Sequence, residues 1–393
     1  MASVRNMLRT LEPGTDATGQ NDQVTGATEI ATLRSLDAIL QSGGSLDGLR
    51  LQDLDLRDRE AVLLAQTHAN GTVVLGGATT PALDGHLRQI GALVFPTDPA
   101  LPVNPYRGTL YTPAELYTGL AEGGYSATPD ARAYRWLRDR RTAGDAYATL
   151  VRAMHDDAMS DALIELLDDR PVVGVMGGHS VRADSAQYVD AARLGFDLAE
   201  AGFLVATGGG PGAMEAANLG AAVRDTDSLE HALERLAKTP DWSEGIDAWA
   251  RESASVAASV RISRQVRSLG IPTWFYGHEP PNMFAQRIAK FFSNALREDA
   301  LLTRSSTAIV VLPGTAGTVQ EIFQAVTPMY YVADERPLPS LILVGRQQWT
   351  QDVPVWPAIE AMAKGRPMSN ATHLVESVED VLPLVQRQHG GRS

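Results

Sequence analysis

Apolar runs that end in glycine alternate with amphipathic stretches over the second half of the chain. Continuous apolar runs of this kind are typical of strands that are buried on both faces of a parallel sheet. The amphipathic stretches between them have the period of helices. The alternation predicts an α/β fold with a doubly wound, Rossmann-like parallel sheet. The three clearest runs are 172–176, 203–206 and 307–312.

The same pattern divides the chain into three parts. Residues 1–25 are polar and rich in turn-forming residues, which predicts disorder. Residues 26–168 predict an additional N-terminal α/β and helical region, with strands near 71–77 and 92–95. Residues 169–393 predict the Rossmann-like domain.

Several segments of the last part have weaker patterns. Residues 225–251 predict a helical insertion, whereas 255–262 and 272–276 predict strands. Residues 282–303 predict a helix. A final strand is expected near 373–375, followed by a helix at the C-terminal end.

Composition narrows the possible classes of protein. The chain has 393 residues, of which 44% are hydrophobic, so that it can form a large packed core. It has no cysteine, which excludes disulfides and thiolate chemistry and agrees with a cytoplasmic location. Its net charge of −13 does not suit a nucleic acid polymer as partner. We expect no membrane association, because the apolar runs are too short for a span and the N-terminus lacks the apolar stretch of a secretory signal.

The glycine-rich turn after the third apolar run is the first candidate binding site. Gly314, Thr315, Gly317 and Thr318 lie where the strand passes into a helix. Backbone N–H groups and the positive end of the helix dipole bind phosphate at such a place. Glu321 lies one turn into the helix, where a carboxylate can reach a sugar beside the phosphate. The same pattern also occurs in a plain strand-to-helix turn with a solvated glutamate.

Two further turns are expected at the same edge of the sheet, because ligands of open α/β sheets bind at the carboxyl ends of the strands. Neither of the two glycine-rich loops, 208–212 and 314–318, is a Walker A sequence or a dinucleotide-binding motif. His179 either contacts the ligand or caps the next helix together with Ser180. The candidate residues of these turns are Gly178, His179, Gly208, Gly209, Gly210, Gly212 and Met214.

A basic segment precedes the third run. Arg287, Lys290 and Asn294 are spaced for one face of the predicted helix, and Arg297 follows three residues later. The stripe is either a solvated helix face or a cationic partner for a bound phosphate or base. Asn282, at the start of this segment, is a further candidate for ligand binding.

Together these motifs resemble the Lonely Guy (LOG) family, long labelled as lysine decarboxylases, over residues 171–345. The hallmark of the family is Pro-Gly-Gly-x-Gly-Thr-x-x-Glu. It is matched here by Pro313-Gly314, Gly317-Thr318 and Glu321, with Thr315 in place of the second glycine. A β-branched residue disfavours positive φ, so this substitution predicts a slightly different loop.

The resemblance also points to a catalytic arginine shortly before the hallmark strand. Arg297 is the best candidate, although its spacing is one residue longer than usual. Arg287 and Arg304 therefore stay open as alternatives. The long N-terminal region is similar to that of the larger bacterial nucleotide nucleosidases of the group.

Members of the family hydrolyse the N-glycosidic bond of nucleoside 5′-monophosphates. The resemblance implies a small-molecule nucleotide as ligand, AMP-like or a cytokinin riboside monophosphate, and no metal or organic cofactor. Glu321 would stabilise the positive charge at the ribosyl carbon or activate water. Arg297 would orient the ribose or the phosphate, or assist the leaving base. A homodimer or a higher homo-oligomer is expected.

A nucleotide sensor without catalysis is the alternative, since one fold serves many functions. Thr315 and the spacing of Arg297 favour this alternative. In the N-terminal region, residues 104–107 (Asn-Pro-Tyr-Arg) either bind a second nucleotide as an effector or pack a proline-rich loop.

Overall fold

The computed structural model describes residues 28–168, 170–276, 279–332 and 337–390. The chain forms two compact units, of which the smaller comprises residues 1–109 and 144–163 and the larger comprises 110–143 and 164–393. The disorder predicted for 1–25 lies outside the described residues.

The segment 110–143 belongs to the larger unit, whereas the sequence placed it in the N-terminal region 26–168. Long-range polar contacts explain the difference. The Tyr117 hydroxyl donates to the carbonyl oxygen of Pro281 at 2.5 Å, and Tyr111 forms an antiparallel bridge with Ile288. Contacts of this kind leave no local signal in the sequence.

The smaller unit contains a four-stranded parallel sheet in the order β1-β2-β3-β4. A helical segment separates each strand from the next along the chain. The order of the strands in the sheet is the same as their order in the sequence. Leucines at 0% exposure form its core, among them Leu36, Leu51 and Leu63. The elements are β1 Thr28–Ile30, α2 Leu33–Gln41, β2 Leu49–Gln52, α3 Glu60–Leu64, β3 Val73–Leu75, α4 Pro81–Gln89 and β4 Leu93–Phe95.

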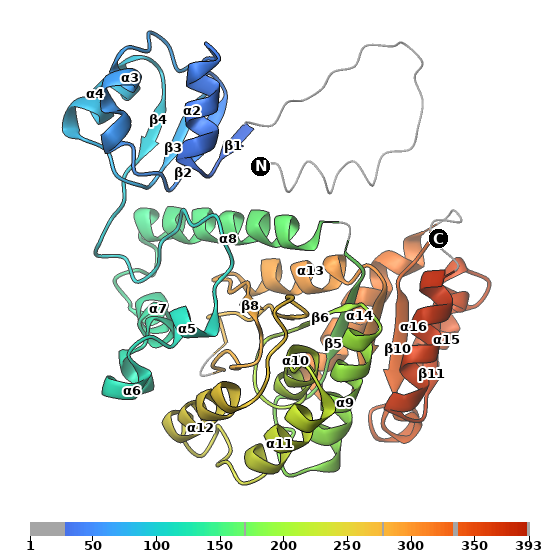
Figure 1. The fold of residues 1–393 in the computed structure, drawn as a ribbon. Coiled ribbons are helices and arrows are strands. Elements are labelled where there is room, and N and C mark those ends of the chain that lie inside the picture. Colours follow the sequence, from blue (N-terminus) through green and yellow to red (C-terminus); the bar gives the residue numbers. More distant parts are fainter. Residues whose placement is uncertain (1–27, 169, 277–278, 333–336, 391–393) are drawn as a thin grey trace. The chain divides into compact units, whose positions relative to one another are not determined.

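The larger unit contains seven parallel strands in the order β11-β10-β9-β5-β6-β7-β8 (Figure 1). The chain starts in the middle at β5, moves outward through β6 to β8, and returns to the other side of β5 with β9. This reversal is the switch point of a doubly wound fold, where ligands bind. The strands are β5 Val172–Met176, β6 Leu204–Thr207, β7 Ser268–Gly270, β8 Arg287–Ile288, β9 Ala308–Val311, β10 Ser340–Val344 and β11 Thr372–Val375.

Helices cover this sheet and form a core that is rich in alanine. The helices α9 and α10 pack on each other and on β5 and β6, and α16 contributes Val381 and Val385 to the same core. The helices of the larger unit are α5 Pro113–Leu116, α6 Leu120–Gly123, α7 Pro129–Arg138, α9 Ala186–Glu200, α10 Ala213–Ala222, α11 Thr226–Leu236, α12 Ile246–Ser259, α13 Asn294–Arg304, α14 Ala316–Tyr331, α15 Trp356–Ala363 and α16 Val381–Gly390. Most of helix α8, Ala146–Leu167, belongs to the smaller unit.

The fold class predicted from the sequence is confirmed, and three local predictions are wrong. The segment 255–262 is mostly the end of helix α12, whose buried Trp249, Ser253 and Val256 have helical spacing. The segment 272–276 is no strand and forms only an isolated bridge between Thr273 and Phe291.

The third error concerns the basic segment. The helix predicted over 282–303 begins only at Asn294, after Ser293 as N-cap. Residues before it are irregular and include the short strand β8. Arg287, Lys290 and Asn294 therefore do not share a helical face, and Lys290 is buried at 1% exposure.

Candidate functional site

Three loops meet at the carboxyl ends of β5, β6 and β9, on both sides of the switch point. The N–H of Gly178 donates to the carbonyl oxygen of Pro313 at 3.2 Å. The N–H of Ala213 donates to the carbonyl oxygen of Gly178 at 3.1 Å. These two hydrogen bonds join the loop after β5 to the other two, so the three predicted turns form one continuous rim.

The loop after β6 depends on its glycines. Gly209 and Gly212 have φ angles of 73° and 72°, which disfavour any other residue. A Cβ at Gly212 would lie 2.6 Å from the carbonyl oxygens of Gly178 and His179. The close approach of the two loops therefore requires glycine at this position.

Buried amide side chains hold this loop from below. Asn282 is fully buried, and its Nδ2 donates to the Gly210 carbonyl oxygen at 3.1 Å and to Asn218 Oδ1 at 2.9 Å. The Oδ1 of Asn282 accepts the N–H groups of Phe284 and Ala285. The side chain predicted to bind the ligand thus shapes the glycine loop from behind it.

Asn218 extends this network and was missed by the sequence analysis. Its Oδ1 also accepts the Thr207 hydroxyl at 2.7 Å, and its Nδ2 donates to Ser268 Oγ at 2.9 Å. The signal available in the sequence is an asparagine inside helix α10, which is apolar apart from Glu215 and Asn218, because a buried amide needs partners.

Arg297 and Glu321 form a buried ion pair beside the glycine loop. Arg297 Nη1 lies 3.0 Å from Glu321 Oε1, and the two side chains are 10% and 14% exposed. Arg297 Nε donates to the carbonyl oxygen of Ile271 at 2.9 Å. A Cβ at Gly208 would collide with the Arg297 guanidinium, so the arginine packs directly on the loop.

This geometry distinguishes the three arginines that the sequence left open. Arg287 lies on β8 and donates through Nη1 to the carbonyl oxygen of Gln286, and Arg304 ends helix α13. Arg297 contacts both the predicted catalytic glutamate and the glycine loop. Among the three, it is the arginine for which the structure records an ion pair with Glu321.

The electrostatics of Glu321 follow from its burial. Burial raises the pKa of this carboxyl, and the neighbouring charges of Glu298 and Glu279 raise the pKa further. Arg297 acts in the opposite direction through its charge and its hydrogen bond, and the net effect is a raised pKa. The carboxyl therefore takes up a proton at a higher pH than an ordinary glutamate.

The turn between β9 and α14 accommodates Thr315 without strain. Its φ of −119° lies in the extended region, so a glycine is not required there. Gly314 is required, because a Cβ at that position would overlap the Thr318 side chain. The first N–H groups of α14 follow, which include those of Gly317 and Thr318 and have no partner inside the helix.

Met214, at the start of α10, lies against the glycine loop. Its Sδ would be 2.8 Å from a Cβ at Gly208, and its Cε would be 3.0 Å from a Cβ at Gly210. The flexible thioether fills the space over both glycines, which suits a side chain that lines a ligand site.

Two charged side chains meet next to Gly210. His179 Nδ1 lies 3.4 Å from Glu279 Oε1, and the two side chains are 50% and 32% exposed. Glu279 Oε2 is 3.7 Å from the position of a Cβ at Gly210. The sequence analysis proposed His179 but missed Glu279, because nothing local shows that 279 lies beside 179.

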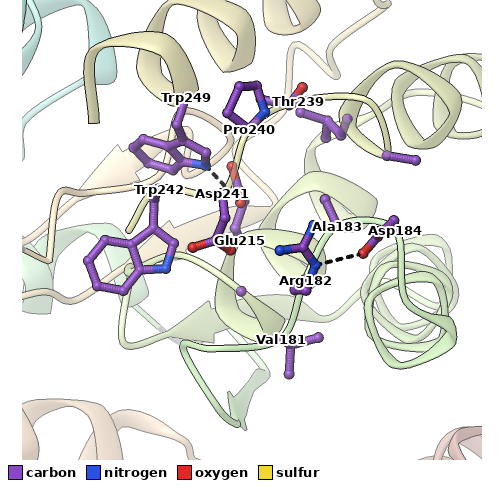
Figure 2. Close-up of a pocket in the computed structure, with 13 residues that line it drawn as sticks. Val181, Arg182, Ala183, Asp184, Glu215, Thr239, Pro240, Asp241, Trp242 and Trp249 are labelled. Atoms are coloured by element: carbon purple, nitrogen blue, oxygen red, sulfur yellow. Dashed lines mark hydrogen bonds and ion pairs between the residues drawn. The ribbon is translucent and has the colours of Figure 1, made fainter. Parts of the chain in front are cut away.

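A small cavity that opens to solvent lies beside Gly212 rather than over the Arg297–Glu321 pair. Figure 2 shows Glu215 between the tryptophans Trp242 and Trp249 and the pair Arg182–Asp184. Burial raises the pKa of Glu215 to about 7, against hydrogen bonds from Trp249 and Ser253. The carboxyl attaches α12 to the start of α10.

The N-terminal cluster 104–107 is used for packing within the smaller unit. Tyr106 is 4% exposed, and its ring lies against Gly76. Asn104 Nδ2 donates to Asp53 Oδ2 at 2.7 Å, and Arg107 Nε donates to the carbonyl oxygen of Thr109. These contacts favour the packing interpretation over an effector site.

The residues that the structure describes (28–168, 170–276, 279–332 and 337–390) contain no group of three or more histidine, aspartate or glutamate side chains arranged to hold a metal ion. Within the same ranges, no helix is both long enough and apolar enough to cross a membrane.

Comparisons with known proteins give one family match, and no curated protein matches the chain. Solved structures align with the chain at low sequence identity, among them two proteins of the molybdenum cofactor. The molybdenum cofactor binding protein from the phototrophic bacterium Rippkaea orientalis is 16% identical, over 56% of this chain and 98% of its own, with a TM-score of 0.34. The molybdenum cofactor carrier protein from Chlamydomonas reinhardtii is 18% identical, over 56% of this chain and 99% of its own, also with a TM-score of 0.34.

The family match lies on the part of the chain that builds the first half of the site. Residues 170–229 match the model of the SLOG cluster4 family. They include β5, α9, β6, the loop 208–212 and α10. The strand order of the sheet independently has the Rossmann-type switch point. Residues 170–229 are therefore similar to the SLOG cluster4 family, and the larger unit has a Rossmann-type sheet.

Proposed function

We propose that the protein hydrolyses the N-glycosidic bond of nucleoside 5′-monophosphates and releases the base and ribose 5-phosphate. The observation that carries this proposal is the buried Arg297–Glu321 pair, 3.0 Å apart, against the glycine loop at the switch point. A buried carboxylate next to a phosphate-binding helix terminus suits a reaction that develops positive charge on a ribose.

Each element has a role in this proposal. The N–H groups at the start of α14 and the Thr318 hydroxyl bind the 5′-phosphate. Glu321, one turn further along the helix, faces the ribosyl carbon, stabilises the oxocarbenium-like charge and accepts the proton of the attacking water. Arg297 holds Glu321 in place and opposes the rise of its pKa that burial causes. The glycines 208–210 and Met214 contact the ribose and the base.

Incubation of the protein with AMP, GMP, CMP and IMP tests the proposal. Release of the free base is measured by chromatography. Turnover of at least one nucleotide is expected, with ribose 5-phosphate formed in equal amount. The complete absence of base release with all four nucleotides, in spite of binding, would contradict hydrolysis.

Nucleotide binding without hydrolysis is the second candidate. It is favoured by one observation, namely that Arg297 already uses Nη1 for Glu321 and Nε for the Ile271 carbonyl oxygen. A ligand that stabilises the protein in a thermal-shift experiment, without loss of its base, would support this candidate.

The pH dependence of the reaction follows from the raised pKa of Glu321. The ionised carboxylate is the active form, so kcat/KM is expected to fall on the acid side, at a higher pH than an ordinary glutamate would give. Glu298→Gln removes one of the charges that raise this pKa, and the acid limb should move to lower pH. The pH profiles of kcat/KM for the two proteins measure the shift, and a shift to higher pH would contradict the assignment of this limb to Glu321.

A further inference from the structure

The departing base needs a proton, and neither member of the Arg297–Glu321 pair supplies it well. An arginine guanidinium does not lose a proton in proteins. Arg297 also uses Nε and Nη1 for the Ile271 carbonyl oxygen and Glu321. Glu321 takes a proton from water in the proposed reaction, so the acid must be another group.

We propose that His179 is the general acid that protonates the leaving base, and that Glu279 positions its ring; this assignment rests on the hydrolase function proposed above. Histidine is the most common general acid near neutral pH. His179 Nδ1 lies 3.4 Å from Glu279 Oε1, so Nε2 is the ring nitrogen that can face a ligand. A carboxylate that orients an imidazole through one nitrogen is a recurrent catalytic arrangement.

Further contacts fix the place of His179. Its carbonyl oxygen accepts the N–H of Trp242 Nε1 at 3.2 Å. The Trp242 ring meets the imidazole edge to face, with 5.9 Å between the ring centres. The main chain and the ring are therefore both held, although the side chain is half exposed and accessible to a ligand.

Contacts along the rim of the site place His179 and Glu279 on the side where the base of the nucleotide would lie. Gly208 packs on Arg297, and Met214 covers both Gly208 and Gly210. Gly210 in turn lies next to Glu279. With the phosphate at the start of α14 and the ribosyl carbon at Glu321, the base extends along the glycine loop toward His179.

The bond between the ribosyl carbon and the ring nitrogen breaks, and its electron pair stays with the base. His179 Nε2–H gives its proton to a ring nitrogen of the base, and water adds to the ribosyl carbon while its proton passes to Glu321. Solvent then returns the proton to His179 and removes the one on Glu321, so no oxidant, reductant or co-reactant is required.

A leaving group that needs no proton provides the test. GMP is compared with 7-methylguanosine 5′-monophosphate, whose base already carries a positive charge and departs without protonation. For His179→Gln we expect kcat with GMP to fall by about 10²-fold or more, in the range of general acid catalysis. With the methylated nucleotide, kcat should fall by less than about threefold, because the acid no longer contributes.

Two further variants complete the test. Glu279→Gln should lower kcat with GMP by a smaller factor than His179→Gln and leave kcat with the methylated nucleotide within about threefold, while KM changes little. His68→Gln is the matched control, because His68 forms a similarly exposed pair with Asp47 at 2.9 Å in the smaller unit, and it should leave kcat unchanged. Equal losses of kcat for both nucleotides, or no loss for either, would overturn the role of His179. If the wild-type protein hydrolyses neither of these two nucleotides nor AMP, CMP or IMP, the proposed function is overturned and this assignment with it.

Discussion

Replacing Glu321 with glutamine is expected to lower kcat for nucleotide hydrolysis by about 10²- to 10³-fold, the effect typical of losing one preorganised electrostatic group. Glutamine has the same shape and can still accept the hydrogen bond from Arg297 Nη1, which is 3.0 Å long in the wild type. The loss therefore reports the missing negative charge at the ribosyl carbon. Base release is measured under saturating nucleotide, and nucleotide binding by calorimetry should be retained.

Glu298→Gln is the control for this variant. Glu298 is also buried, at 8% exposure, and its carboxylate accepts hydrogen bonds from Asn294 and Gln320 rather than from Arg297. At a pH where Glu321 is ionised, this control should keep most of the wild-type kcat. A Glu321→Gln variant within threefold of wild type would show that the carboxylate has no catalytic charge role.

Replacing Asp130 with alanine is expected to destabilise the larger unit by about 3–5 kcal/mol, because it leaves a buried ammonium without its counter-charge. Lys290 Nζ lies 2.7 Å from Asp130 Oδ1, and both side chains are 1% exposed. Asp130 also accepts hydrogen bonds from Trp274 Nε1 at 2.8 Å and from the Tyr125 hydroxyl at 2.7 Å. Thermal unfolding should show a fall in the melting temperature on the order of 10 °C.

A double variant separates the unpaired charge from the lost packing. Burial lowers the pKa of Lys290, against the effect of Asp130, so an ammonium without Asp130 is costly to keep charged. Asp130→Ala combined with Lys290→Met should recover a large part of the lost stability. Asp184→Ala, in the half-exposed pair with Arg182, is the control and should change the melting temperature little. A double variant no more stable than Asp130→Ala would contradict the unpaired charge as the cause.

The central strands of the larger unit could be predicted because they are buried on both faces. The predicted runs correspond to β5, β6 and β9, in which every residue is buried. Their continuous apolar sequence is a direct consequence of that burial. The glycine loops were predictable for a related reason, since positive φ at Gly209 and Gly212 leaves glycine as the suitable residue.

The errors arise where tertiary contacts override local pattern. Helix α12 ends in alanine, serine and valine, so its short valine-containing stretch resembles a strand. In the segment before α13, the polar residues have the spacing of one helix face. Lys290 is nevertheless buried in an ion pair with Asp130, which lies 160 positions earlier in the sequence. The sequence around Asp130 or around Lys290 gives no sign that the two residues form a pair.

The candidate site was predicted in part. Arg297 could be preferred from its position shortly before the hallmark strand, yet only the fold places it against Glu321 and Gly208. Asn282 was identified as a ligand contact and instead holds the glycine loop through Gly210. The proximity of Glu279 to His179 depends on loops from distant strands and has no counterpart in the local sequence.

The most direct test of the account is a mass balance on AMP with the wild-type protein. Adenine and ribose 5-phosphate are quantified together over many turnovers by chromatography. If the protein hydrolyses AMP, the two products appear in a ratio of one to one, AMP disappears at the same rate, and Glu321→Gln abolishes most of this turnover. Stable binding of AMP with no adenine formed, or release of phosphate in place of adenine, would contradict it.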